Sequence, residues 1–225
     1  MLDFNEIVKT FKGTAGILPL PDFVMFPKTS YSFNIFEPKY RQLMDHILSG
    51  DKFFCLTLLK EQGSNQISKF NKFGTLAYVI DYKKKTNGDY NIIVSGINKV
   101  SIKEIESENL YRMGALELLN DNDVIIEEHL KRKKLINKFI QLVGSENMEF
   151  ADVKSLDLSF ISTEILTNLA CLVLPLSSNN KQKLLELNDI NLRLDILCQF
   201  MDSELKLESD LLNFNQVIPL NIKWN

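Results

Sequence analysis

The side chains best suited to chemistry in this sequence are two histidines and three cysteines. The histidines are His46 and His129, and the cysteines are Cys55, Cys171 and Cys198. A structural zinc site needs four ligands at short, regular spacings, whereas these five residues are scattered along the chain. We therefore expect no metal site, and we expect His46 to lie on the exposed side of a helix.

An enzyme would need a nucleophile beside a base, or a pair of carboxylates in a cleft. Cys55 is the candidate nucleophile, but it lies in the apolar run Phe53–Leu59, where burial should raise the pKa of its thiol. No histidine stands in an identifiable relation to it. The chain also lacks the Gly-x-x-x-x-Gly-Lys-Ser/Thr pattern that cradles phosphates. The sequence thus predicts a non-enzymatic protein with no catalytic residues and no cofactor.

Two short basic runs raise the question of nucleic-acid binding. They are Lys83-Lys84-Lys85 and Lys131-Arg132-Lys133-Lys134, and Tyr82 and Tyr90 flank the first run. RNA-binding surfaces combine basic residues with aromatic rings that stack on bases, so an RNA-binding module is the alternative function. The formal net charge of −3 does not favour it, because such domains are usually basic. We interpret the runs as a charged hairpin tip and a solvated helix face.

The segment Phe36-Glu37-Pro38-Lys39-Tyr40-Arg41 is the most distinctive short motif. Proline is well tolerated in the first helical turn, where its missing N–H has no partner to lose. Glu37 suits the positive helix N-terminus and precedes Arg41 by four residues. We expect Phe36 and Tyr40 to enter the core, and the alternative is that the motif forms a recognition surface.

Before about residue 120, short apolar runs alternate with turn signals and predict strands. Asn87-Gly88 is a strong hairpin signal, because both residues tolerate positive φ. Pro19 and Pro21 lack amide donors and indicate an edge strand or an extended entry segment. About seven strands are expected, at residues 17–20, 31–35, 53–59, 74–80, 90–95, 100–105 and 111–118. Turns this frequent favour a closed or nearly closed antiparallel barrel.

Helical periodicity dominates after about residue 120. One earlier helix is predicted from Glu37-Pro38 to Leu48. The later helices are expected at 124–143, at 159–174, after the capping residues Ser177 and Ser178, and from Asn188 or Asp189 to about residue 207.

The cellular compartment follows from the cysteines and from the absence of targeting signals. An odd number of widely spaced cysteines indicates reduced thiols rather than a disulfide framework. The N-terminus has no basic region followed by an apolar core, and no apolar run reaches the roughly 18 residues that span a bilayer. We therefore expect a cytoplasmic protein with no membrane partner.

Six segments, in order, resemble the N-terminal substrate-binding domain of Lon proteases. In the helical part, the residues that match are the family's Lys-Gln, Leu-Leu-Glu and Arg. One residue departs from the family pattern, because Lys39 stands where the family usually has Arg. The matching segments are Ile17-Leu18-Pro19-Leu20, Val24-Met25-Phe26-Pro27, Ile35–Tyr40, Phe73–Ala77, Asp89–Gly96 and Lys181–Glu186 with Arg193-Leu194.

The resemblance implies an α+β fold, in which a PUA-like antiparallel β pseudo-barrel is followed by a C-terminal α-helical bundle. We expect the barrel at 1–118, the bundle at 119–208 and a tail at 209–225. The resemblance also implies polypeptide binding. Because the sequence departs from the family in lacking the phosphate-cradling pattern and the protease domain, we expect a stand-alone, non-catalytic module without the ATPase and protease domains. Such a module would bind unfolded or flexible polypeptide segments, or a protein partner, as an adaptor or chaperone-like accessory in protein quality control.

Aromatic residues and the tail are the remaining candidates for contact with polypeptides. We expect most of Tyr31, Phe33, Phe53, Phe54, Phe70 and Phe73 to be core residues, whereas any that line an exposed groove would suit apolar segments. The tail from Leu211 to Asn225 is too apolar for a solvated segment. We expect it to fold back as an extended strand and fill a groove. The sequence identifies no individual binding residue.

Overall fold

The computed structural model describes residues 4–60, 69–121, 129–144 and 161–204. These residues form two compact units. Of these described residues, the first unit contains those up to Asn120 together with Ser177–Glu186, and the second contains Asp121, 129–144, 161–176 and 187–204.

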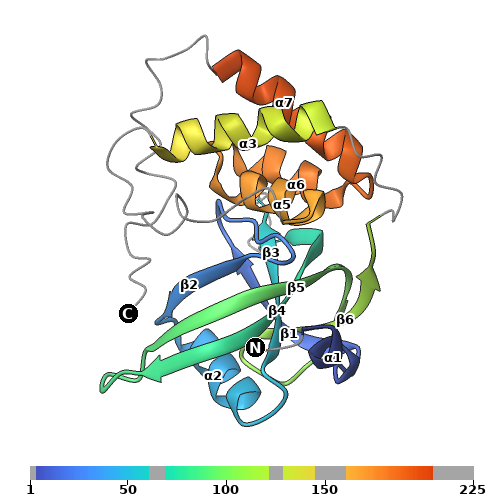
Figure 1. Cartoon of the computed structure of the whole chain (residues 1–225). Helices are drawn as coiled ribbons and strands as arrows, with labels where there is room; N and C mark the ends of the chain where they lie inside the picture. Colours follow the sequence, from blue (N-terminus) through green and yellow to red (C-terminus); the bar gives the residue numbers. More distant parts are fainter. Residues whose placement is uncertain (1–3, 61–68, 122–128, 145–160, 205–225) are drawn as a thin grey trace. The chain divides into compact units, whose positions relative to one another are not determined.

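The first unit is built on one six-stranded sheet (Figure 1). Its strands are β1 (Thr14–Leu20), β2 (Ser30–Ile35), β3 (Phe53–Leu59), β4 (Phe70–Lys84), β5 (Tyr90–Ile105) and β6 (Arg112–Leu119). They lie in the order β2-β5-β4-β3-β1-β6, and β6 pairs additionally with β5. This extra pairing closes β5, β4, β3, β1 and β6 into a cycle and leaves β2 as a flanking strand. The predicted α+β fold class is confirmed.

One long strand replaces two that were expected at 90–95 and 100–105. The first part of β5, Tyr90–Ser95, pairs with β2, and Lys99–Ile105 pair with β6. Gly96 lies between the two parts, where a Cβ would meet the backbone oxygen of Phe26 at 2.3 Å. This glycine therefore marks a close approach of two backbones within a continuous strand, not a turn.

The sheet is mixed, because β1 runs parallel to β3 and antiparallel to β6. The fully antiparallel arrangement expected from sequence is thus wrong for this one pairing. Ile17 is the last residue of β1 that pairs on both sides, and Pro19 pairs only with Thr57 of β3. A residue without an amide donor is tolerated where a strand has a single neighbour, so the edge position inferred for Pro19 holds for the second half of β1.

Within the described ranges, three helices belong to the first unit. The buried stripe of α2 (Pro38–Leu48) packs into the core cluster that contains Phe54, Ile92 and Val94. Helix α1 (Phe4–Lys9), which sequence patterns did not predict, precedes a turn whose Phe11 ring packs edge-on against Phe53 at 5.3 Å. Helix α6 (Ser178–Glu186) was expected in the bundle, but it packs on β4 in the first unit.

The second unit contains α3 (His129–Gly144), α5 (Thr163–Val173) and α7 (Ile190–Glu204), which pack against one another. The Ser162 side chain caps α5 by accepting from the Ile165 amide at 3.2 Å. Asp189 caps α7 by accepting from the Asn191 and Leu192 amides. The predicted capping role of Asp189 is thus confirmed. The helix starts predicted at residues 124 and 159, and the tail expected at 209–225, lie outside the described residues.

No helix within the described ranges is both long enough and apolar enough to span a membrane.

Candidate functional site

Three aromatic rings gather on the surface of the first unit and form what we call the aromatic patch. Phe23 comes from the β1–β2 loop, while Tyr31 and Phe33 are two residues apart on β2 and therefore share one face. The ring centroids lie 4.6 Å apart for Phe23–Tyr31, 5.2 Å for Phe23–Phe33 and 4.8 Å for Tyr31–Phe33. All three side chains are only partly buried against the core beneath them.

The loop that supplies Phe23 is held in place by backbone contacts. The Lys28 amide donates to the oxygen of Gly96 at 2.8 Å, and the Gly96 amide donates to the oxygen of Thr29 at 2.8 Å. The Thr29 hydroxyl donates back to the oxygen of Phe26 at 2.7 Å, and Phe26 is fully buried. Because the loop is anchored through Phe26, the neighbouring Phe23 ring is presented on a fixed backbone.

The strand that carries the other two rings has a free edge. In the described part of the chain, residues Ser30–Ile35 of β2 pair only with Tyr90–Ser95 of β5. An edge strand presents unpaired N–H and C=O groups that can form hydrogen bonds with a further strand. Hydrogen-bonding backbone and aromatic rings are therefore combined on one six-residue strand.

Partial burial makes the phenol of Tyr31 harder to ionise. Desolvation raises the pKa of its phenol to about 12, because burial disfavours the ionised form. The phenol is neutral at pH 7, as it is in an ordinary tyrosine, so the ring offers an apolar contact surface with one polar group.

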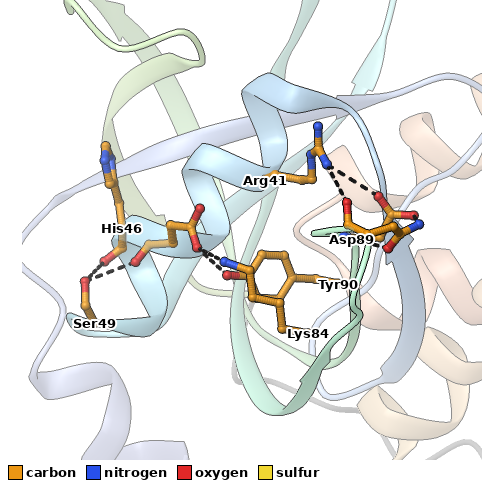
Figure 2. Close-up of polar contacts among 8 residues, drawn as sticks. Arg41, His46, Ser49, Lys84, Asp89 and Tyr90 are labelled. Carbon is orange, nitrogen blue, oxygen red and sulfur yellow. Dashed lines mark hydrogen bonds and ion pairs between the residues drawn. The ribbon is translucent and has the colours of Figure 1, made fainter.

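A polar network fastens α2 to the β4–β5 hairpin, as Figure 2 shows. The Lys84 ammonium donates to Asp45 at 2.7 Å, and the Tyr90 hydroxyl donates to the same carboxylate. The ammonium holds the pKa of the Asp45 carboxyl below its usual range, with the Tyr90 hydrogen bond second. At the hairpin tip, Arg41 donates to the oxygen of Asn87 at 3.1 Å and lies 3.8 Å from Asp89.

This network weakens the case for a nucleic-acid site at Lys83-Lys84-Lys85. Of the two flanking aromatics, Tyr90 is buried and only Tyr82 is exposed. Lys84 is bound to Asp45, and Lys85 donates to the side chain of Asn34 at 3.2 Å. Lys84 and Lys85 are thus engaged within the fold, in agreement with the interpretation of this run as a charged hairpin tip.

A comparison with protein-family models matches most of the chain. The model of the ATP-dependent protease La (LON) substrate-binding domain matches residues 14–203. The chain belongs to this family. It is 22% identical over 213 residues to the Lon protease of Buchnera aphidicola subsp. Acyrthosiphon pisum (strain APS), covering 93% of this chain and 27% of that protein. The Escherichia coli (strain K12) Lon protease is 22% identical over 210 residues, covering 92% and 26%.

Solved structures of Lon N-terminal domains share the fold. The N-terminal domain of Mycobacterium avium complex Lon protease superposes with a TM-score of 0.63 at 14% identity, covering 84% of this chain and 98% of that one. The Lon N-terminal domain protein from Xanthomonas campestris gives 0.61 at 18% identity with the same coverages. This Lon-family chain spans about a quarter of the length of the curated relatives that it matches.

The family's Phe-Glu-Pro motif behaves differently from expectation at one position. Tyr40 enters the core, as predicted, but Phe36 is 62% exposed. Phe36 lies after the last residue of β2 and before α2, so neither the strand's nor the helix's buried face dictates its direction. Glu37 also departs from expectation, because it pairs with Lys39 at 3.1 Å while Arg41 contacts the hairpin tip.

Other residues singled out in this Lon-family domain have structural roles. His46 is on the exposed side of α2, and its Nδ1 lies 2.7 Å from the Tyr111 hydroxyl. Cys55 is fully buried, and desolvation raises the pKa of its thiol, as expected. Among the described residues, no group of three or more His, Cys, Asp or Glu side chains is arranged to hold a metal ion.

One hollow was not anticipated from the sequence. The loop between β5 and β6 lines an open surface hollow of about 820 Å³, and the lining includes Glu104, Glu106, Glu108 and Leu110. Glu104 is paired with Arg112 at 3.5 Å. The sequence feature that could have indicated this hollow is the acidic pattern Glu104-x-Glu106-x-Glu108, which lies where β5 ends.

Proposed function

We propose that this domain recognises extended, apolar polypeptide segments on the aromatic patch of Phe23, Tyr31 and Phe33. It serves as a non-enzymatic adaptor or chaperone-like accessory in the cytoplasm. The observation that carries the proposal is the meeting of three partly exposed rings with the free edge of β2. Membership of the substrate-binding family supports the same class of ligand.

The physical case rests on how polypeptides are held by proteins. Aromatic side chains supply large contact areas and dominate the binding energy of many interfaces. A free strand edge adds main-chain hydrogen bonds that any extended sequence can make, because every residue except proline has both a donor and an acceptor. Together these two features favour binding that is tolerant of sequence but requires apolar side chains.

The experiment measures binding of fluorescein-labelled casein, an unfolded polypeptide, to the full chain by fluorescence anisotropy. The test variant is Phe23→Ser with Tyr31→Ser, and the matched control is Tyr82→Ser, which removes an exposed ring from β4. We expect the double variant to weaken casein binding at least tenfold, since loss of one aromatic anchor commonly costs more than about 1.4 kcal/mol. The control should bind casein as the unaltered chain does.

The rival function is tested with the same preparation and a labelled single-stranded RNA. Replacing Lys83, Lys84 and Lys85 by Gln should leave casein binding nearly unchanged. Binding to RNA that falls steeply with salt and is lost in this triple variant, together with no binding to casein, would refute the proposal. Far-UV circular dichroism of each variant verifies that the fold is retained.

A further inference from the structure

Contacts of the neighbouring strand β5 determine which backbone groups of β2 point outward. The Gly96 amide donates to the Thr29 oxygen at 2.8 Å, and the register of β2 with β5 continues from this pair without a shift. In an antiparallel pair of strands, residues that exchange backbone hydrogen bonds alternate with residues that do not. Tyr31 and Phe33 lie two and four residues after Thr29, so their N–H and C=O groups point toward β5.

The other side of β5 gives the same result independently. The Lys85 amide donates to the Asp89 oxygen at 2.7 Å, and the adjoining pairs of β4 and β5 keep this register. The backbone of Asn91 therefore points toward β4, and that of the next residue, Ile92, points toward β2. Ile92 is in register with Phe33. Both observations thus direct the Phe33 backbone toward β5.

The backbone groups at the free edge of β2 therefore belong to Ser30, Ser32 and Asn34. Among the residues that the structure describes, no strand pairs with them on that side. Their side chains are exposed, whereas Tyr31 and Phe33 lie on the opposite face and pack partly against the core. All five residues are uncharged, which suits an apolar polypeptide better than a phosphate backbone.

We propose that a polypeptide docks by adding an antiparallel strand to this edge and places two alternate apolar side chains opposite Tyr31 and Phe33. The residue between those two lies opposite Ser32 and exchanges both backbone hydrogen bonds with it, so that residue cannot be proline. The apolar residues form the closer, non-bonded pairs, with Cα atoms about 4.5 Å apart, which brings their side chains against the rings. This docking mode rests on the proposed function and narrows its substrate class to segments that read apolar, non-proline, apolar.

The direction of the added strand decides which of its amides are used. In an antiparallel strand the residue opposite Ser32 bonds to it, and the two apolar neighbours direct their own N–H groups away from β2. In a parallel strand the bonds to Ser32 would come from those two neighbours instead. Antiparallel pairing is slightly more stable per residue and more common, and it continues the arrangement that β2 already has with β5.

The first test uses a fluorescein-labelled peptide, Gly-Ser-Thr-Leu-Thr-Phe-Thr-Ser-Gly, whose single pair of apolar side chains fixes the register. Fluorescence anisotropy measures its binding to the full chain. N-methylation of the threonine between leucine and phenylalanine removes the amide that bonds to Ser32 and should weaken binding about tenfold or more, because the Ser32 oxygen loses its donor. N-methylation of the leucine is the matched control and should change the affinity less than about twofold, because that amide points away from β2.

The second test examines the protein itself by amide hydrogen exchange, followed by NMR. In the free chain the Tyr31 and Phe33 amides should exchange slowly and the Ser32 and Asn34 amides quickly, and the unmethylated peptide should slow the fast pair. Ser32→Pro removes only an outward amide, which edge strands tolerate, so circular dichroism should show a retained fold while peptide binding is lost. Ser32→Val keeps the amide and should bind as the unaltered chain does.

Equal losses from the two N-methylated peptides, or a greater loss from methylated leucine, would overturn antiparallel docking. Slow exchange of the Ser32 amide with fast exchange of the Phe33 amide in the free chain would overturn the assignment of the outward groups. If casein binds but the two methylation sites do not differ, the proposed function stands and this docking mode fails. If the peptide binds as expected but casein does not, the proposed function fails and the docking mode stands. Absence of binding to both ligands would refute both.

Discussion

Arg193 Nη1 lies 3.0 Å from Asp121 Oδ2, and the arginine side chain is 1% exposed. The same nitrogen donates to Asn168 Oδ1 at 2.7 Å, while Nη2 donates to the oxygen of Leu187 at 2.7 Å. A buried guanidinium needs a charge partner and filled hydrogen bonds, because water no longer solvates it. Through these contacts Arg193 connects α7 to the segment before α3, by way of Asp121, and to α5, by way of Asn168.

The first prediction concerns that pair. Asp121→Asn removes a carboxylate that pairs with the buried charge of Arg193 and should lower the free energy of unfolding by about 3–5 kcal/mol. Urea unfolding followed by circular dichroism measures the change. Adding Arg193→Met to Asp121→Asn should recover part of the loss, because the double variant no longer buries the guanidinium charge. Glu6→Gln, which breaks the exposed Lys9–Glu6 pair, should cost less than about 1 kcal/mol. Equal losses for Asp121→Asn and Glu6→Gln would contradict the prediction.

The second prediction separates the two aromatics of the Phe-Glu-Pro motif. Tyr40 is 8% exposed, so Tyr40→Ala should destabilise the first unit by about 3–5 kcal/mol, as large-to-small core substitutions do. Phe36 is 62% exposed, so Phe36→Ala should stay within about 0.5 kcal/mol. Thermal melts of both variants test this difference. A large loss of stability in Phe36→Ala would show that its ring is buried in solution.

Two glycines provide the third prediction. A methyl group at Gly96 would meet the Phe26 backbone oxygen at 2.3 Å, whereas at Gly50 the nearest atom is the His46 oxygen at 3.5 Å. Gly96→Ala should therefore cost at least the roughly 1–3 kcal/mol typical of overpacking, and Gly50→Ala should be close to neutral. The comparison of urea midpoints decides the outcome, and similar midpoints would count against the close approach of the β1–β2 loop to β5.

The fourth prediction is the pH dependence that Tyr31 contributes. Its pKa is raised from 10.0 to about 12 by desolvation, so the folded state binds the phenolic proton more tightly than the unfolded state. The resulting stability is fully present below pH 10 and is lost as the pH rises towards 12. Tyr31→Phe should make the urea midpoint fall less steeply across that interval. Parallel profiles for the two proteins would disprove the assignment, and a remaining slope is expected from Tyr40, Tyr90 and Tyr111, whose pKa values are also raised.

Local signals in the sequence predicted local structure well. The turn at Asn87-Gly88, the stripe of α2 and the cap at Asp189 are each determined by residues within a few positions of one another. Phe36 was mispredicted because it stands between a strand and a helix, where neither periodicity applies. The Glu37–Arg41 pairing failed for a different reason, since the hairpin tip 46 residues away offers Arg41 a competing acceptor.

Long-range pairing was the part that could not be predicted. Tyr31 and Phe33 alternate like the residues of any half-buried strand, and only the sheet order shows that β2 has one neighbour. The parallel pairing of β1 with β3 likewise depends on which strands meet in space. The aromatic patch therefore emerges from topology. The sequence identified Tyr31 and Phe33 only as part of a larger set of aromatic residues, and it did not single out Phe23.

The discontinuous first unit has a consequence for synthesis on the ribosome. The cycle of strands cannot close until β6 has been synthesised and can pair with β1. Helix α6 can contact β4 only after the residues between them have been translated. Contacts between residues so distant in sequence slow folding, because the intervening chain loses entropy when the ends meet. Until about residue 186 has been synthesised, the nascent chain exposes strand edges and apolar faces, which makes the unfinished domain prone to association with other chains.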